Sequence, residues 1–143
     1  MTMTVAQPHA TGASHYTAEM PCVRESASCA RALISSVLAV WGMDGDVADR
    51  GKLIVTELLA NAVEHTETTV TKIRVERPVD RTVRIEVSDL SHNAPHLKAA
   101  DPGAESGRGL RLVAAMSLRW GYDYHPWGKV TWAEVEARAR NEP

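Results

Sequence analysis

The chain has 143 residues, a formal net charge of -2, and a composition that is 44% hydrophobic and 24% charged. These values are typical of one soluble globular domain and exclude fibrous, largely disordered and membrane-spanning chains. The net charge lacks the basic excess that binding to nucleic-acid phosphates requires. The first 14 residues lack the features of a secretion signal. We therefore expect a disordered tail over 1–14, one domain over 15–143, a cytoplasmic location, and no direct binding to nucleic acid or membrane.

Apolar periodicity and turn residues predict a series of alternating elements. In chain order these are a strand over 15–24, helices over 27–41 and 46–66, strands over 69–76 and 82–89, a helix over 107–119, and strands over 120–125 and 129–137. Ser26 is expected to cap the first helix, and Asp46 or Asp49 to begin the second. The short connection Arg77-Pro78-Val79-Asp80 makes the two middle strands an antiparallel hairpin. The order predicts an α/β protein in two layers, a sheet covered on one face by helices.

Cysteine and histidine residues give no sign of a disulfide framework or a zinc site. Cys22 and Cys29 are expected to be reduced packing residues. Pro95 lies between His92 and His96 and prevents a regular helix from presenting both imidazoles to one metal ion. We therefore look elsewhere for the residues that carry chemistry.

The helix over 51–66 is apolar on most of its circumference and carries one polar stripe, formed by Glu57, Asn61, Glu64 and His65. Glu57 and Asn61 are four residues apart, so their side chains lie one above the other. The amide oxygen of Asn61 is a hard donor suited to Mg²⁺, and the Glu57 carboxylate can accept a proton from a nucleophile. The alternative is an ordinary stripe that faces solvent.

The strand over 82–89 alternates, and Asp89 is in register with its apolar face. A carboxylate that points under the helices costs free energy unless a hydrogen-bond donor satisfies it, and the amino group of a ligand would do so. The alternative is that Asp89 caps a turn in the loop that follows. The register alone leaves both interpretations open.

Glycines open the predicted helix at Gly107-Arg108-Gly109-Leu110, directly after the long loop. Free backbone N–H groups at a helix start can bind a phosphate, and glycine leaves room for it. The alternative is a plain turn. The segment does not follow a strand as a dinucleotide-binding fingerprint would, and it lacks the Gly-Lys-Ser/Thr ending of a P-loop.

Taken in order, three segments resemble the N, G1 and G2 boxes of the GHKL ATPase superfamily. They are Glu57-Leu-Leu-Ala-Asn61-Ala-Val-Glu-His65, Val87-Ser-Asp89 and Gly107-Arg108-Gly109-Leu110. Within that superfamily, the short length, the lack of a phospho-acceptor helical domain in these residues, and the closing Trp120-Gly121 and Gly128-Lys129-Val-Thr-Trp132 look like the bacterial anti-sigma factor serine/threonine kinases. The resemblance runs from about His15 to Val135.

This resemblance implies a mixed β-sheet covered on one face by helices, with the loop over about 91–106 as a lid above ATP. It implies that Asn61 binds Mg²⁺, that Glu57 orients or deprotonates the attacking hydroxyl, and that Asp89 recognises the adenine amino group. The phosphates would then be held by the loop of Gly107, Arg108, Gly109 and Leu110. The chain departs from the superfamily at the G1 box, because Asp89-Leu-Ser91-His-Asn93 lacks both glycines of the usual Asp-x-Gly-x-Gly.

Two functions follow from the resemblance. The first is an anti-sigma factor that sequesters a sigma factor and transfers the γ-phosphate of ATP to a Ser or Thr of an anti-anti-sigma (STAS-type) partner. The second is a non-catalytic module that binds proteins in an ATP-dependent way. The resembling kinases often act as dimers, which allows a homodimer here.

Overall fold

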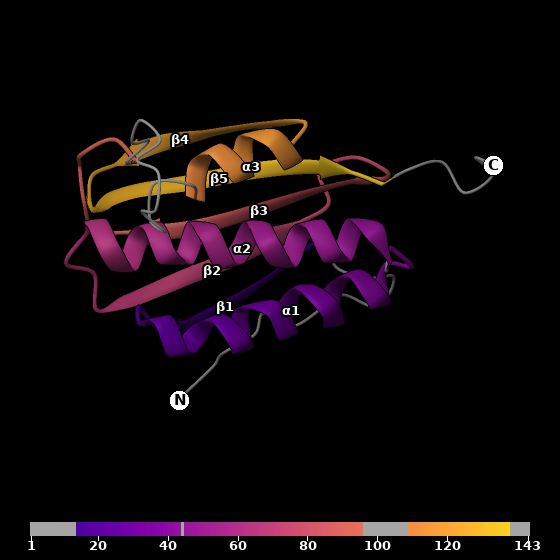
Figure 1. The fold of residues 1–143 in the computed structure, drawn as a ribbon, viewed down its shortest axis with the longest axis horizontal. Coiled ribbons are helices and arrows are strands. Elements are labelled where there is room, and N and C mark those ends of the chain that lie inside the picture. The colour runs from indigo at the N-terminus through magenta and orange to yellow at the C-terminus, as the bar shows by residue number, and fades with distance from the viewer. Residues whose placement is uncertain (1–13, 44, 96–108, 138–143) are drawn as a thin grey trace.

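The computed structural model describes residues 14–43, 45–95 and 109–137. Three α-helices, a short 3-10 helix and five strands form within these ranges. The elements are β1 (His15–Pro21), η1 (Arg24–Ser26), α1 (Ala27–Val40), α2 (Asp46–His65), β2 (Val70–Glu76), β3 (Thr82–Asp89), α3 (Gly109–Met116), β4 (Arg119–His125) and β5 (Gly128–Glu136). All three helices cover the same face of one sheet (Figure 1). The two-layer architecture predicted from the sequence is confirmed.

The sheet has the strand order β1-β2-β3-β5-β4. Every neighbouring pair is antiparallel, so the expectation of a mixed sheet is wrong within the described residues. The reason lies in the strand order. β3 and β4 run in the same direction on either side of a helical connection, but β5 folds back as a hairpin and lies between them.

The hydrophobic core lies between the sheet and the helices. Alternation along β3 turns Val83, Ile85 and Val87 inward, where all three are buried. The polar stripe of α2 divides its surface, and the apolar remainder of that helix packs on the sheet and on α1. Burial of these side chains supplies the main favourable free energy of folding. None of the described helices is long and apolar enough to cross a lipid bilayer.

The start of α1 differs from the expectation. Ser26 precedes the helix, but its side chain makes no capping hydrogen bond to the helix start. Instead the Ser26 hydroxyl donates to the carbonyl oxygen of Pro21 at 2.7 Å. Because η1 leads directly into α1, Ser26 has helical backbone angles, and it cannot adopt the extended conformation that a capping residue needs.

The face of the sheet opposite the helices carries a charged network centred on Arg84. Its guanidinium pairs with Glu86 at 2.8 Å and with Glu134 at 3.1 Å, and it lies over the ring of Trp132, 4.1 Å from the centroid. Arg119 pairs with the other oxygen of Glu134 at 2.7 Å. The network covers the indole ring and thereby shields apolar surface on a face that has no helix.

Within this network, Glu134 pairs with both Arg84 and Arg119 and is nearly fully buried. Burial alone would raise the pKa of Glu134, but hydrogen bonds from Arg119 and Arg84 and their positive charges lower that pKa below its ordinary value of 4.5. A carboxyl group whose pKa is lower in the folded state stabilises the fold above that ordinary value. This stabilisation is lost as the pH falls through the lowered pKa.

We predict that Glu134→Gln lowers the free energy of unfolding at pH 7 by about 2 kcal/mol, because two charge-assisted hydrogen bonds lose their acceptor charge. Urea denaturation at pH 7 and at about pH 3.5 measures the effect. The difference between wild type and variant should shrink at the lower pH, because there the unfolded wild-type chain is already protonated at Glu134 while the folded state resists protonation. An equal difference at both pH values would contradict the ion-pair explanation.

Candidate functional site

The start of α3 lies directly against the polar stripe of α2. A Cβ atom added at Gly109 would lie 3.1 Å from Oε2 of Glu57, which is closer than ordinary van der Waals contact. α3 packs along α2 in the same region. Asn61 lies one turn after Glu57 on the continuous helix α2, as the spacing predicted. The structure therefore brings Glu57 and Gly109 together, and it places Asn61 next to them along the helix.

The first turn of α3 provides the chemistry of an anion site. The N–H groups at a helix start have no partner within the helix, and the helix dipole favours negative charge there. The absence of a side chain at Gly109 lets the backbone approach Glu57. The side chain of Leu110 is buried in the core, so only its backbone can contact a ligand. Gly107, Arg108 and positions 96–106 of the predicted lid lie outside the described residues.

Asp89 is buried at the end of β3 and points to the helical side, as its register predicted. Its Oδ1 accepts two hydrogen bonds, one from the backbone N–H of Ser91 at 2.8 Å and one from the ammonium of Lys129 at 3.0 Å. The Ser91 contact is the turn that the sequence allowed as an alternative. The Lys129 contact is an internal counterpart of the ligand amino group. The turn interpretation is therefore confirmed, and contact between Asp89 and a ligand amino group stays a prediction.

A chain of hydroxyl groups fixes Asp89 relative to α2. The Thr66 hydroxyl donates to the carbonyl oxygen of Ala62 on α2 at 2.6 Å and lies 2.7 Å from the hydroxyl of Thr68. The Thr68 hydroxyl oxygen in turn accepts the backbone N–H of Leu90 at 2.9 Å. The residue after Asp89 is therefore tied to the last turn of the helix that carries Glu57 and Asn61.

Gly128, at the start of β5, lies against the end of β3. A Cβ atom added there would lie 2.1 Å from the carbonyl oxygen of Asp89, which is closer than any side chain permits. Glycine is therefore required at the start of β5 so that this strand can approach β3. The close approach is what places Lys129, the next residue, directly opposite Asp89.

An open hollow of about 790 Å³ lies between the end of α2 and the segment after β3. Glu64 and His65 of the predicted polar stripe line it, together with Ser91, the residue that donates to Asp89. Glu64 is held in place by an ion pair with Arg24 at 2.8 Å. The hollow is polar and provides space for a polar ligand at the end of α2, but Glu57, Asn61, Asp89 and Gly109 do not line it.

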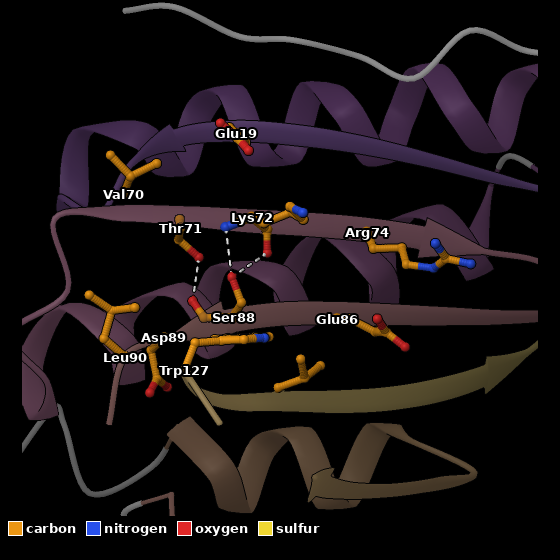
Figure 2. Close-up of a pocket in the computed structure, with 11 residues that line it drawn as sticks. Glu19, Val70, Thr71, Lys72, Arg74, Glu86, Ser88, Asp89, Leu90 and Trp127 are labelled. Atoms are coloured by element: carbon orange, nitrogen blue, oxygen red, sulfur yellow. Dashed lines mark hydrogen bonds between the residues drawn. The ribbon is translucent and has the colours of Figure 1, made fainter. Parts of the chain in front are cut away.

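A second pocket, of about 370 Å³, lies on the opposite face of the sheet (Figure 2). Its floor is β2 and β3, which are joined there by hydrogen bonds from the backbone N–H of Lys72 to the Ser88 hydroxyl and from the Thr71 hydroxyl to the Ser88 carbonyl. Exposed Val70, Leu90 and Trp127 border one end. Asp89 lines this pocket, whereas Glu57, Asn61 and Gly109 line neither of the two cavities. We assign the candidate site to the helical side because Glu57 meets the start of α3 there.

The two cysteines are free, as expected. Burial, and to a lesser extent the negative charge of Asp89, raise the pKa of the Cys22 thiol. A raised pKa keeps Cys22 in the thiol form, in which it is a weak nucleophile. Its role next to Asp89 is therefore packing.

Sequence reasoning missed Lys129 and Thr68. The signal for Lys129 was present, because it alternates with Thr131, Ala133 and Val135 on the apolar face of β5. A buried charge costs free energy unless it has a partner, so a lysine in that register needs a buried counter-charge just as Asp89 does. Thr68 gave no local signal, because its hydrogen bond to Leu90 depends on how α2 and β3 lie relative to each other.

The residues present fit a magnesium ion that is shared with a ligand. Within residues 14–43, 45–95 and 109–137, no three His, Cys, Asp or Glu side chains gather closely enough to hold a metal ion by themselves. Mg²⁺ in nucleotide sites usually has one or two protein oxygen ligands, and phosphates and water complete the octahedron. The amide oxygen of Asn61 beside the carboxylate of Glu57 is a donor set of this kind.

The family model of the histidine kinase-like ATPase domain matches residues 21–135. This match covers most of the chain, so the chain belongs to the histidine kinase-like ATPase family. No curated protein matches the sequence. Family membership agrees with the two-layer fold and implies that the domain uses ATP.

We predict that Lys129→Met lowers the free energy of unfolding by about 3–5 kcal/mol, because it leaves the buried carboxylate of Asp89 without a counter-charge. The double variant Lys129→Met/Asp89→Asn should lose much less than the sum of the two single variants. Urea denaturation of the four proteins measures the coupling. Additive effects would show that the two groups do not stabilise each other.

Proposed function

We propose that the protein is an ATP-binding anti-sigma factor with serine/threonine kinase activity. The observation that carries this proposal is the contact between Glu57 and the start of α3, where a Cβ at Gly109 would lie 3.1 Å from the carboxylate oxygen. A helix start binds phosphate through its N–H groups. A carboxylate at the same place can orient a hydroxyl nucleophile and accept its proton.

Each part of the site has a role in this proposal. Asn61 supplies an amide oxygen to Mg²⁺, which would neutralise charge on the phosphates. The N–H groups at the start of α3 bind the phosphates, and Asp89 accepts a hydrogen bond from the amino group of the base. Phosphoryl transfer depends mainly on such positioning and charge stabilisation. These assignments rest on the geometry around Glu57 and on the order of the matching motifs.

The regulatory partners are part of the same proposal. The closing segment from Trp120 to Trp132 resembles that of anti-sigma factor kinases, which supports a STAS-type anti-anti-sigma protein as the phosphorylated partner and a sigma factor as the sequestered one. The hollow beside the site leaves room for a hydroxyl presented by another protein. We expect transfer to a Ser or Thr side chain of that partner.

We predict that Glu57→Gln lowers the rate of phosphoryl transfer at least about 100-fold, because the carboxylate no longer accepts the proton. The assay uses radiolabelled ATP with Mg²⁺ and the purified STAS-type proteins of the same genome. ATP affinity should change less than about threefold, since the variant keeps the size and shape of the side chain. Glu19→Gln, an exposed site on β1 at the opposite face, is the matched control.

The same assay separates the kinase from the non-catalytic alternative. A wild-type protein that binds ATP but transfers phosphate to none of these partners would refute the kinase proposal. It would favour the module that binds proteins in an ATP-dependent way.

We predict that Asn61→Ala weakens binding of ATP about tenfold or more in the presence of Mg²⁺ and only slightly in the presence of a chelator, because the amide oxygen acts through the metal ion. Isothermal titration calorimetry under both conditions measures the two affinities. If the loss is the same with and without Mg²⁺, Asn61 does not act through the metal ion.

A further inference from the structure

The open face of the sheet carries a band of outward side chains along β1 and β2. Alternation along β1 turns Tyr16, Ala18 and Met20 into the core, so the residues between them lie on the face opposite the helices (Figure 1). The same alternation in β2 turns every second residue outward. We call these outward residues the β1–β2 strip, and all of them are exposed or partly exposed: His15, Thr17, Glu19, Pro21, Val70, Lys72, Arg74 and Glu76.

The strip holds two opposite charges that lie next to each other. Glu19 and Lys72 are directly opposite residues of the antiparallel strands β1 and β2, and both are exposed. Neither side chain forms an ion pair within the part of the chain that the structure describes. Arg74, by contrast, pairs with Glu76 of its own strand at 3.3 Å. One carboxylate and one ammonium are therefore available to another molecule.

The pocket of about 370 Å³ on this face gives room for a side chain from that molecule (Figure 2). Apart from Asp89, which is paired internally with Lys129, the charged side chains that line it are two carboxylates and two cations: Glu19, Glu86, Lys72 and Arg74. A strongly acidic or basic partner would meet like charge as often as opposite charge here. A partner surface with the same balance of charges fits better.

A second copy of the chain has this balance, and two-fold symmetry determines which residues would meet. In a face-to-face dimer whose axis runs along the strands, between β1 and β2, the rotation exchanges the positions of the two strands. Each residue of β1 then faces the partner's copy of its own cross-strand neighbour, and every contact occurs twice. The register gives an imidazole with a carboxylate, a hydroxyl with a guanidinium, a carboxylate with an ammonium, and an apolar pair: His15 with Glu76, Thr17 with Arg74, Glu19 with Lys72, and Pro21 with Val70.

We propose that the β1–β2 strip is the interface of a homodimer, in which Glu19 of each protomer pairs with the partner's Lys72. Packed sheets cross at about 30°, so the pairs near the middle of the strip align best. These are Glu19 with Lys72 and Thr17 with Arg74. The interface spans two short strands, so association is weak and depends on protein concentration. The inference does not rest on the proposed nucleotide site.

Sedimentation velocity over a range of protein concentrations tests the dimer. The mass of the wild-type protein should rise from that of a monomer toward that of a dimer. Glu19→Lys and Lys72→Glu should each weaken the dimer at least about tenfold, because like charges then face each other at two symmetric places. Asp80→Lys, a charge reversal at the exposed turn between β2 and β3, is the matched control and should leave association unchanged.

Two combinations of these variants test the pairing itself. The double variant Glu19→Lys/Lys72→Glu exchanges the two charges and should regain the wild-type dissociation constant to within about threefold, because the two residues act as a pair. An equimolar mixture of the two single variants should also associate. One of them then presents two ammonium groups and the other presents two carboxylates, so opposite charges meet at both symmetric places.

Three results would overturn the proposal. They are a wild-type protein that stays monomeric at every concentration, a dimer that tolerates either single reversal, and a mixture of the single variants that does not associate. Should the double variant not fold, as circular dichroism would show, the mixture decides. Every variant should bind ATP as the wild type does, since Glu57 and Gly109 meet on the helical side within one chain. Absence of ATP binding in the wild type would count against the proposed function and leave the dimer standing.

Discussion

The candidate site depends on one buried carboxylate that needs hydrogen bonds and a counter-charge from within the fold. Asp89 ends β3 on the apolar side of the sheet, where an unpaired charge would cost several kcal/mol. The fold supplies a turn amide from Ser91, the ammonium of Lys129, and a close approach of β5 that only Gly128 permits. These contacts fix the direction of the carboxylate. The position of the Asp89 carboxylate is therefore set by strand pairing.

Alternation along the strands places different sets of side chains on the two faces of the sheet. On the open face, Arg84 covers Trp132 and joins carboxylates from its own strand and from β5, so that charge and apolar surface are satisfied within the chain. On the helical face, α2 brings Glu57 to the start of α3, where the first backbone N–H groups have no partner within their own helix, and Asn61 lies one turn further along α2. Among the described residues, only the helical face combines a helix start, a proton acceptor and a hard oxygen donor, which is why we propose phosphate chemistry on that face.

Local patterns predicted much of this arrangement. The four-residue spacing of Glu57 and Asn61 and the strand register of Asp89 depend on the geometry of single elements, and both hold in the structure. The partner of Asp89 could not be derived in the same way, because Lys129 lies 40 residues later and meets it only if β5 inserts between β3 and β4. That strand order also makes the sheet antiparallel, which the expected mixed sheet did not anticipate. The Ser26 cap failed for a local reason, since η1 gives that residue helical angles.

The two ends of the proposed site differ in how many contacts hold them in place. At the base end, the hydrogen bonds from Ala62 through Thr66 and Thr68 to Leu90 tie α2 to β3, and strand pairing fixes Asp89 against Lys129. If Asp89 contacts the base as proposed, its carboxylate is oriented before any ligand arrives, because these hydrogen bonds already hold it. At the phosphate end, Glu57 meets α3 through one close backbone contact at Gly109. The position of this short helix then determines whether a carboxylate and a set of amides face the same phosphate. The position of α3 against α2 would then decide whether a bound nucleotide transfers its phosphate or is only bound.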